Sequence, residues 1–277
     1  MDASALIRQV HDSNRQAADA AARWATHRAR VMDVLGQAGM AGGRLALLGA
    51  GHLHDVRLAQ LVDDYSEVTL VDLDPAPARG AVARVPGAGA RTRVHAPVDL
   101  TGVLHLLPAA AGGPHGVAEV LTYLETDACD IPGEPFDMTV SLGVLTQLMQ
   151  AVTDAGVAPA DVPRLSLAIR DKHLRDLVRI TRPGGTLVVI TDIVATTSAP
   201  GLRDVPEPAL EPHLARLVAA GNFFTGTNPY RLVAVLEEEP PFRDDIERAR
   251  FVGPWLWRIT ADREHLTGAI VAERRRR

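Results

Sequence analysis

Short apolar runs, separated from one another by segments with helical patterning, divide the first two thirds of the sequence. The expected strands cover residues 45–48, 68–71, 92–98, 136–141 and 186–191. Strands that alternate with helices are typical of right-handed strand–helix–strand units and of a mostly parallel sheet. Two further runs, 255–259 and 266–272, are joined by TADREH, a connection of hairpin length, so we expect them to be antiparallel. The sequence predicts an α/β fold with a mostly parallel seven-stranded sheet, helices on both faces and an antiparallel C-terminal hairpin.

The regions outside these strands suggest two additions to the sheet domain. Apolar residues recur at three- and four-residue steps over 3–36, which predicts one long helix. We therefore expect an N-terminal helical extension over 1–40 and a sheet domain over 41–277. Proline-rich residues 199–212 begin a different pattern, and we expect a lid-like insertion around 199–240.

Composition excludes several classes of protein. The chain has 277 residues, 47% of them hydrophobic and 23% charged, with a net charge of −5, which are globular values. A net negative charge argues against general nucleic-acid binding. No apolar run reaches the length of a membrane span, the N-terminus has no signal-peptide pattern, and Cys129 is the sole cysteine. We expect a cytoplasmic protein that binds neither nucleic acid nor membrane. Lys172 is the sole lysine, so Schiff-base chemistry has one candidate.

A glycine turn follows the first strand in LALLGAGHLHDV, residues 45–56. Gly49 and Gly51 let backbone N–H groups approach a ligand beside a helix N-terminus, at the strand ends where α/β sheets bind ligands. The dinucleotide fingerprint G-x-G-x-x-G is incomplete, because its sixth position is His54. An ordinary structural turn explains the two glycines as well. His52 and His54 lack a third partner, so we expect no metal, and His52 is expected to border the ligand.

Carboxylates follow the second and third strands. Asp72 can accept hydrogen bonds from both hydroxyls of a ribose, although a strand-end carboxylate in water is the alternative. Asp74, before Pro75, is expected to cap the next helix. Asp99 with Leu100 lies where an adenine edge would be, although the segment DLTG also fits a simple turn.

These segments together resemble the class I S-adenosylmethionine-dependent methyltransferases. LALLGAGHLHDV, VTLVDLDP, VDLTGV, FDMTVSLGVLTQL and LVRITRPGGTLVVITD occur in that family's order over roughly residues 44–192, and the terminal hairpin extends the likeness. The resemblance implies S-adenosylmethionine as cofactor. It assigns the backbone of Gly49, Ala50 and Gly51 to the methionine part, Asp72 to the ribose, Leu73, Asp99 and Leu100 to the adenine, and Ser141, Leu142 and Gly143 to the methyl-transfer side.

The sequence departs from the family at two positions. The family's third glycine is Leu53 here, and no acid precedes Gly49 in the first strand. The ammonium group of the cofactor then needs another partner, for which Asp55 is the candidate. A first-turn aspartate that favours the helix dipole is the alternative for Asp55.

No residue is assigned as the catalytic base, because in-line methyl transfer demands mainly alignment and desolvation. His173 and Tyr230 are candidates, with a packing role as the alternative for His173. Aromatic and amide side chains gather in GNFFTGTNPYRL, residues 221–232, which forms either a substrate lid or a small core under a long loop. The expected substrate-binding residues are Gln147, Asn222, Phe223, Phe224, Asn228 and Tyr230.

The expected function is methyl transfer to an oxygen or nitrogen of a small-molecule acceptor. The alternatives are a protein that binds S-adenosylmethionine without transferring its methyl group and, disfavoured by His54, an NAD(P)-dependent oxidoreductase. Trp255 and Trp257 alternate on one face and are expected in the core, whereas Trp24 either covers the cofactor or contacts a second copy in a homodimer.

Overall fold

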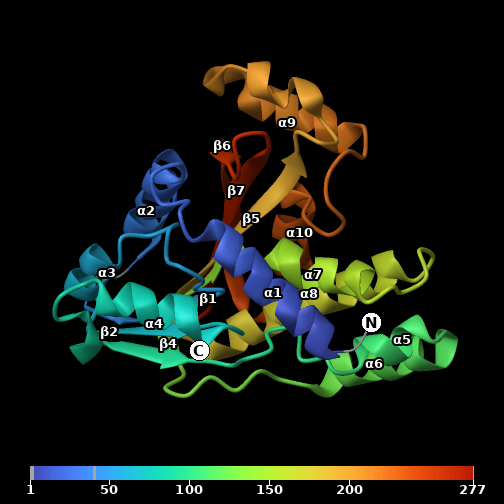
Figure 1. Cartoon of the computed structure of the whole chain (residues 1–277), viewed down its shortest axis with the longest axis horizontal. Coiled ribbons are helices and arrows are strands. Elements are labelled where there is room, and N and C mark those ends of the chain that lie inside the picture. The colour runs from blue at the N-terminus through green and yellow to red at the C-terminus, as the bar shows by residue number, and fades with distance from the viewer. Residues whose placement is uncertain (1–2, 40–41, 277) are drawn as a thin grey trace.

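A seven-stranded sheet in the order β3-β2-β1-β4-β5-β7-β6 forms the centre of the molecule (Figure 1). The computed structural model describes residues 3–39 and 42–276. The strands are β1 Arg44–Leu48, β2 Glu67–Val71, β3 Thr92–His95, β4 Phe136–Leu142, β5 Thr181–Ala195, β6 Ile246–Arg258 and β7 Glu264–Arg274. The first five strands pair in parallel, and β7 pairs antiparallel with both β5 and β6. The predicted fold class, including the antiparallel C-terminal hairpin, is confirmed.

Helices cover both faces of the sheet, because successive side chains of a buried strand point to opposite sides. In β1, Leu45 and Leu47 belong to one core, and Ala46 and Leu48 belong to the other. The first core is completed by α2 Ala25–Ala38, α3 Leu58–Asp64 and α4 Pro75–Ala83. The second core is completed by α5 Leu107–Ala111, α6 Pro114–Thr126, α7 Leu145–Asp154, α8 Val162–Ile180 and α10 Pro229–Glu238. The sheet is therefore the middle of three layers.

The N-terminal region forms two helices, so the prediction of one helix over 3–36 is wrong. The helix α1 covers Ala3–Ala17, and α2 begins only at Ala25. Side chains occupy carbonyl groups in the break: His54 Nε2 lies 3.0 Å from the oxygen of Ala18, and Arg28 donates to the oxygen of Ala21 at 3.0 Å. Alanine-rich sequence favours a continuous helix, but these contacts override that weak preference.

Two other segments differ from expectation. The glycine content of residues 109–116 favours a loop, but they fall largely within α5 and α6, with a break only around Gly112 and Gly113. The third strand ends at His95, three residues earlier than expected, shortly before Pro97, which has no N–H for a ladder hydrogen bond.

The ends of β5, β6 and β7 extend beyond the parallel strands and carry a small separate core (Figure 1). Ile193 and Leu266 pack there with Leu202 and with Leu210 and Leu214 of α9, which covers Leu210–Ala219. The region around 199–240, predicted as a lid-like insertion, contributes α9 to this core and also contains α10. No helix within residues 3–39 and 42–276 combines the length and the apolar character needed to cross a bilayer.

Candidate functional site

The glycine turn adopts a backbone that the sequence pattern explains. Gly49 has a φ of +80°, and a Cβ added there would lie 2.6 Å from Cβ of Val144, so only glycine lets the turn pass the start of α7. Gly51 has a φ of +47° and open space where its Cβ would be. Leu53, at the family's third glycine position, also has a positive φ of +56°. The turn thus keeps a glycine-like path even where glycine is missing.

Asp72 is joined directly to this turn. Its Oδ2 accepts a 2.7 Å hydrogen bond from the backbone N–H of Gly51, and its Oδ1 accepts one of 2.9 Å from Asp74. Burial raises the pKa of Asp72 above its ordinary value, against these hydrogen bonds. Each carboxylate oxygen has two lone pairs, so both oxygens keep acceptor capacity for a hydroxyl group. Asp74 caps α4 through the N–H of Ala76, as predicted.

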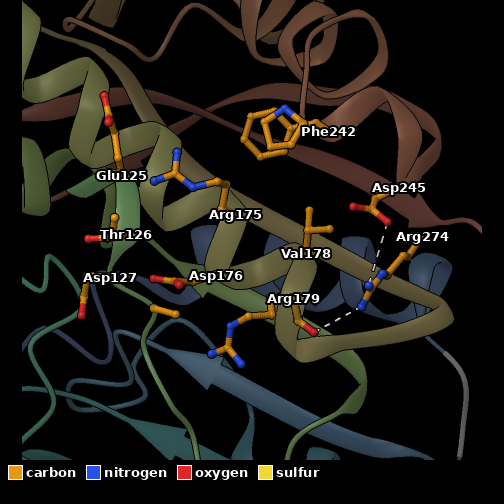
Figure 2. Close-up of a pocket in the computed structure, with 12 residues that line it drawn as sticks. Glu125, Thr126, Asp127, Arg175, Asp176, Val178, Arg179, Phe242, Asp245 and Arg274 are labelled. Carbon is orange, nitrogen blue, oxygen red and sulfur yellow. Dashed lines mark hydrogen bonds and ion pairs between the residues drawn. The ribbon is translucent and has the colours of Figure 1, made fainter. Parts of the chain in front are cut away.

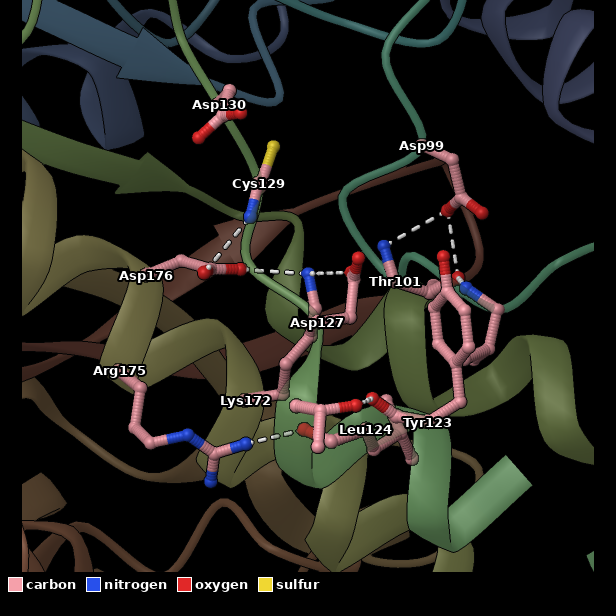
Figure 3. Close-up of polar contacts among 12 residues, drawn as sticks. Asp99, Thr101, Tyr123, Leu124, Asp127, Cys129, Asp130, Lys172, Arg175 and Asp176 are labelled. Atoms are coloured by element: carbon pink, nitrogen blue, oxygen red, sulfur yellow. Dashed lines mark hydrogen bonds and ion pairs between the residues drawn. The ribbon is translucent and has the colours of Figure 1, made fainter. Parts of the chain in front are cut away.

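Asp99 uses both carboxylate oxygens in a local turn. Oδ1 accepts hydrogen bonds from the N–H and the hydroxyl of Thr101, at 2.9 Å and 2.6 Å (Figure 3). Oδ2 accepts a hydrogen bond from the N–H of Leu104 at 2.9 Å. Leu100 is buried beside it, and Leu73 packs at the edge of the same core. The side chain of Asp99 therefore forms the simple turn that was the alternative interpretation of DLTG. Its contact with an adenine stays a prediction.

Asp55 lies beside the N-terminal helices. Its Oδ1 is 3.1 Å from Nε2 of His27, a residue of α2. If Asp55 bound the ammonium group of the cofactor, as predicted, that group would compete with the imidazole of His27. His52 stacks on His54 with ring centroids 5.2 Å apart. In the described part of the chain, no group of three or more histidine, cysteine, aspartate or glutamate side chains is placed to hold a metal ion.

His173 is a packing residue in this structure. It is fully buried, its Nε2 lies 2.8 Å from Oγ of Ser141, and burial together with nearby Lys172 lowers its pKa to about 3. Such an imidazole stays neutral and has no contact with solvent, so the structure does not support the catalytic candidate. It holds the end of β4 in place. Beyond Leu142, which is also buried, Gly143 faces Trp257, and Gln147 donates to the Gly143 carbonyl at 3.3 Å.

The expected substrate lid divides into residues with different roles. Asn222 donates to the oxygen of Ser198 at 3.0 Å, and Asn228 caps α10. Phe223 packs into the small core, while Tyr230 is 44% exposed and contacts Phe251 edge-on. Phe224 lies over the junction of β5 and β7, where its ring centroid is 5.7 Å from that of His265.

A buried aspartate–histidine pair, which was not predicted from the sequence, lies next to Phe224. Asp192 of β5 has Oδ2 2.9 Å from Nδ1 of His265 on β7. The hydroxyl groups of Thr146 and Thr267 also donate to Asp192, at 3.4 Å and 3.2 Å. A signal was present in the sequence: Asp192 directly follows the expected strand 186–191, and His265 directly precedes the expected strand 266–272. Antiparallel neighbours bring two such residues together.

Tryptophan and histidine rings surround this pair. Trp257 stacks on His27 with ring centroids 4.1 Å apart, and it meets Trp24 edge-on at 4.8 Å. Trp255 and Trp257 are buried, as predicted. Trp24, from the break between α1 and α2, donates to the oxygen of Ile259 at 3.3 Å. The N-terminal region therefore covers one side of the Asp192–His265 pair.

Lys172, a buried residue of α8, forms ion pairs with two carboxylates (Figure 3). Its Nζ lies 2.8 Å from Asp176 and 3.2 Å from Asp127. Burial alone would lower the pKa of Lys172, but the two carboxylates outweigh burial and raise it. The amine is therefore protonated and is no Schiff-base nucleophile.

Two cavities flank the sheet at opposite edges. The cavity in Figure 2, of about 340 Å³, is lined by Arg175, Arg179 and Arg274 among others, at the amino ends of the parallel strands. A second cavity, of about 590 Å³, lies between α1 and α4 and is lined by His52 and Asp74 among others. Since ligands of open α/β sheets bind at the carboxyl ends, the second cavity is the one beside the expected cofactor site.

Comparison with known proteins supports the fold. No family model matches the sequence, and no curated protein matches it significantly. The 1,6-didemethyltoxoflavin-N1-methyltransferase of Burkholderia thailandensis, solved with 1,6-didemethyltoxoflavin and S-adenosylhomocysteine, is similar over 99% of this chain and 88% of its own, with a TM-score of 0.52 and 14% identity.

Two further solved structures are similar at lower TM-scores. A S-adenosylmethionine-dependent methyltransferase of Methanosarcina mazei is similar over 88% of this chain and 97% of its own, with a TM-score of 0.47 and 12% identity. The N-methyltransferase NodS of Bradyrhizobium japonicum, with S-adenosylhomocysteine, covers 91% of this chain and 86% of its own, at a TM-score of 0.41 and 11% identity. At such identities the likeness concerns the fold: the chain has the class I methyltransferase fold.

Proposed function

We propose that this chain is an S-adenosylmethionine-dependent methyltransferase that methylates an oxygen or nitrogen of a small-molecule acceptor. One observation carries the proposal: Asp72 at the end of β2 is bonded to the glycine turn after β1, at the carboxyl edge of a sheet with methyltransferase topology. The Burkholderia thailandensis enzyme of similar fold holds S-adenosylhomocysteine and a small molecule, which supports the same pairing of ligands here.

The residues at this edge fit the proposed cofactor. The Asp72 carboxylate keeps acceptor capacity for ribose hydroxyls, and Gly51 leaves open space beside its backbone. Bound S-adenosylmethionine would supply an activated methyl group. The chain's own task is then to align the acceptor and exclude water, and good alignment contributes on the order of 7–11 kcal/mol to such a reaction.

Isothermal titration calorimetry with S-adenosylhomocysteine tests the proposal. We expect wild-type protein to bind it and Asp72→Ala to bind it about 10- to 100-fold more weakly, since a hydrogen bond to a charged group is worth about 1.5–3 kcal/mol. Asp130→Ala removes an exposed carboxylate near Arg179, at the opposite edge, and should bind like wild type.

Other results would decide between the alternatives. Binding of NADH without binding of S-adenosylhomocysteine would contradict the proposal and support an oxidoreductase. Binding of S-adenosylmethionine without methyl transfer to any member of a broad acceptor panel would support a cofactor-binding protein that lacks transferase activity. That second outcome would fit the protein partners that Asp55 and Asp99 already have.

A further inference from the structure

The pair of Asp192 and His265 has the geometry of a base and the group that orients it. Nδ1 of His265 lies 2.9 Å from Asp192, and both side chains are more than nine-tenths buried. A proton on Nδ1 is stabilised by the facing carboxylate, so the lone pair of the neutral ring is left on Nε2. The hydroxyl groups of Thr146, on α7, and Thr267, on β7, also hold the carboxylate.

Two buried polar atoms beside this pair have no hydrogen-bond partner among the described residues. They are Nε2 of His265 and the indole N–H of Trp257, and the two rings lie 6.4 Å apart between centroids. Buried polar groups in proteins are almost always hydrogen-bonded, so an unpaired acceptor and an unpaired donor side by side indicate a ligand that supplies both partners.

The surroundings specify the shape of that ligand. Aromatic rings surround the two unpaired atoms: Trp24 meets Trp257 edge-on, and Phe224 meets His265 edge-on. The six-membered ring of Trp257 comes within 3.7 Å of where a Cβ of Gly143 would be, at the end of β4. Trp24 and Phe224 are partly exposed, so they are the side chains that separate the pair from solvent and must turn aside for entry. Among such rings, a planar aromatic molecule gains both apolar contact and favourable ring geometry.

We propose that His265, oriented by Asp192, takes the proton from a planar aromatic acceptor that carries an ionisable O–H or N–H group. This proposal rests on the proposed methyltransferase function. In the transfer, the O–H or N–H bond breaks and its proton moves to Nε2 of His265, while the O–CH3 or N–CH3 bond forms. The S–CH3 bond of the sulfonium breaks, and its electron pair stays on sulfur. His265 later releases the proton to solvent, and the indole N–H of Trp257 donates to a second acceptor atom of the molecule.

The first experiment needs no knowledge of the natural acceptor. All three tryptophans of the chain lie in this cluster, so tryptophan fluorescence reports its occupation. In the presence of S-adenosylhomocysteine, we expect 4-methylphenol to quench the fluorescence of wild-type protein saturably. Absence of saturable quenching would overturn the acceptor class. Nitrogen NMR of the wild-type imidazoles should show the proton of His265 on Nδ1, and a proton on Nε2 would overturn its role as base.

The second experiment compares His265→Gln with wild type, using S-adenosylmethionine and two acceptors. For 4-methylphenol, which must lose its proton, we expect a loss of about 10²- to 10⁴-fold in kcat. For 4-nitrophenol, which is largely ionised at mildly alkaline pH, the variant should retain most of the wild-type rate at such a pH. Equal loss with both acceptors, or none with 4-methylphenol, would overturn the proposal, as would a wild-type protein that methylates neither.

Further variants separate the possible failures. If His265→Gln does not fold, Asp192→Asn replaces it, with the same acceptor-dependent loss expected because Asp192 is a positioning residue. His115→Gln, an exposed histidine on α6, is the matched control and should behave as wild type. Failure of wild-type protein to bind S-adenosylhomocysteine in calorimetry would refute the methyltransferase function itself, whereas binding with unchanged rates in His265→Gln refutes only the assignment of the base.

Discussion

The indole N–H of Trp255 donates a 3.0 Å hydrogen bond to Nδ1 of His27. Because Nδ1 accepts, the proton of the neutral His27 ring lies on Nε2, which faces Asp55 at 3.1 Å. One imidazole thereby connects β6, α2 and the loop that follows the glycine turn. The N-terminal helices are tied to the sheet edge at which we propose that the cofactor and the acceptor bind.

Loss of this hydrogen bond should destabilise the protein. Trp255→Phe leaves Nδ1 of His27 buried without a donor, and we expect the free energy of unfolding to fall by about 1–3 kcal/mol from that unpaired atom, plus a smaller packing term. Urea unfolding followed by circular dichroism measures it. Tyr230→Phe, which changes an exposed ring, should stay within about 0.5 kcal/mol of wild type. An equally small effect of Trp255→Phe would show that the bond contributes little.

Alanine at Gly51 should separate backbone strain from ligand binding. Both Gly51 and Gly42 have positive φ values and open space where a Cβ would be, and Gly42 lies before β1, at the opposite edge. We expect Gly51→Ala and Gly42→Ala to lose about 1 kcal/mol of stability each. Calorimetry should show weaker binding of S-adenosylhomocysteine for Gly51→Ala alone. Equal affinities in the two variants would place the cofactor away from the turn.

His173 should make stability depend on pH in a defined window. The pKa is 6.5 in the unfolded chain and about 3 in the folded protein, so only the unfolded chain takes up the proton between these values. Stability from this group is complete above pH 6.5 and is lost as pH falls towards 3. At pH 5 the loss is about 2 kcal/mol relative to pH 8.

A matched pair of variants tests that window. His173→Gln keeps a polar atom near the position of Nε2, close to Ser141, but does not titrate, so the free energy of unfolding should change less between pH 8 and pH 5 than in wild type. His115→Gln, at an exposed position, should keep the wild-type dependence. Identical slopes in all three proteins would mean that His173 is not the group responsible.

Removal of the sole lysine should be costly. Lys172→Met leaves Asp176 buried without its cation, and breaking a buried ion pair from one side typically costs about 3–5 kcal/mol. Chemical denaturation should show this loss. Lys172→Met with Asp176→Leu removes both charges and should recover part of it, whereas a double variant no more stable than the single one would contradict the assignment.

Features that depend on strand order could be predicted from the sequence. The contact of Asp72 with the glycine turn follows from two parallel neighbours that end at one edge, and hydrophobic patterning locates both strands. The turn around Asp99 was an open alternative, because an aspartate that binds N–H groups two to five residues later is a local pattern. Hydrogen bonds within a turn and the pairing of neighbouring strands are features that can be predicted well from a single sequence.

Features that depend on distant partners were not predicted. The break between α1 and α2 involves His54, which lies close to the carbonyl oxygen of Ala18 within an alanine-rich stretch that itself favours helix. His265 was not predicted as a site residue because its partner Asp192 lies on another strand, and the antiparallel register of β7 with β5 is needed to bring the two together. Contacts between side chains that are far apart in the sequence cannot be predicted from its pattern alone.

The enclosure of Lys172 has a practical consequence for experiments on this chain. With its only ε-amino group sealed between Asp127 and Asp176, the folded protein offers amine-acylating reagents no lysine target within the described structure. Acylation of that residue can proceed only through transient opening of the layer that contains α8. The rate of acylation, followed by mass spectrometry, therefore reports how often this part of the core opens.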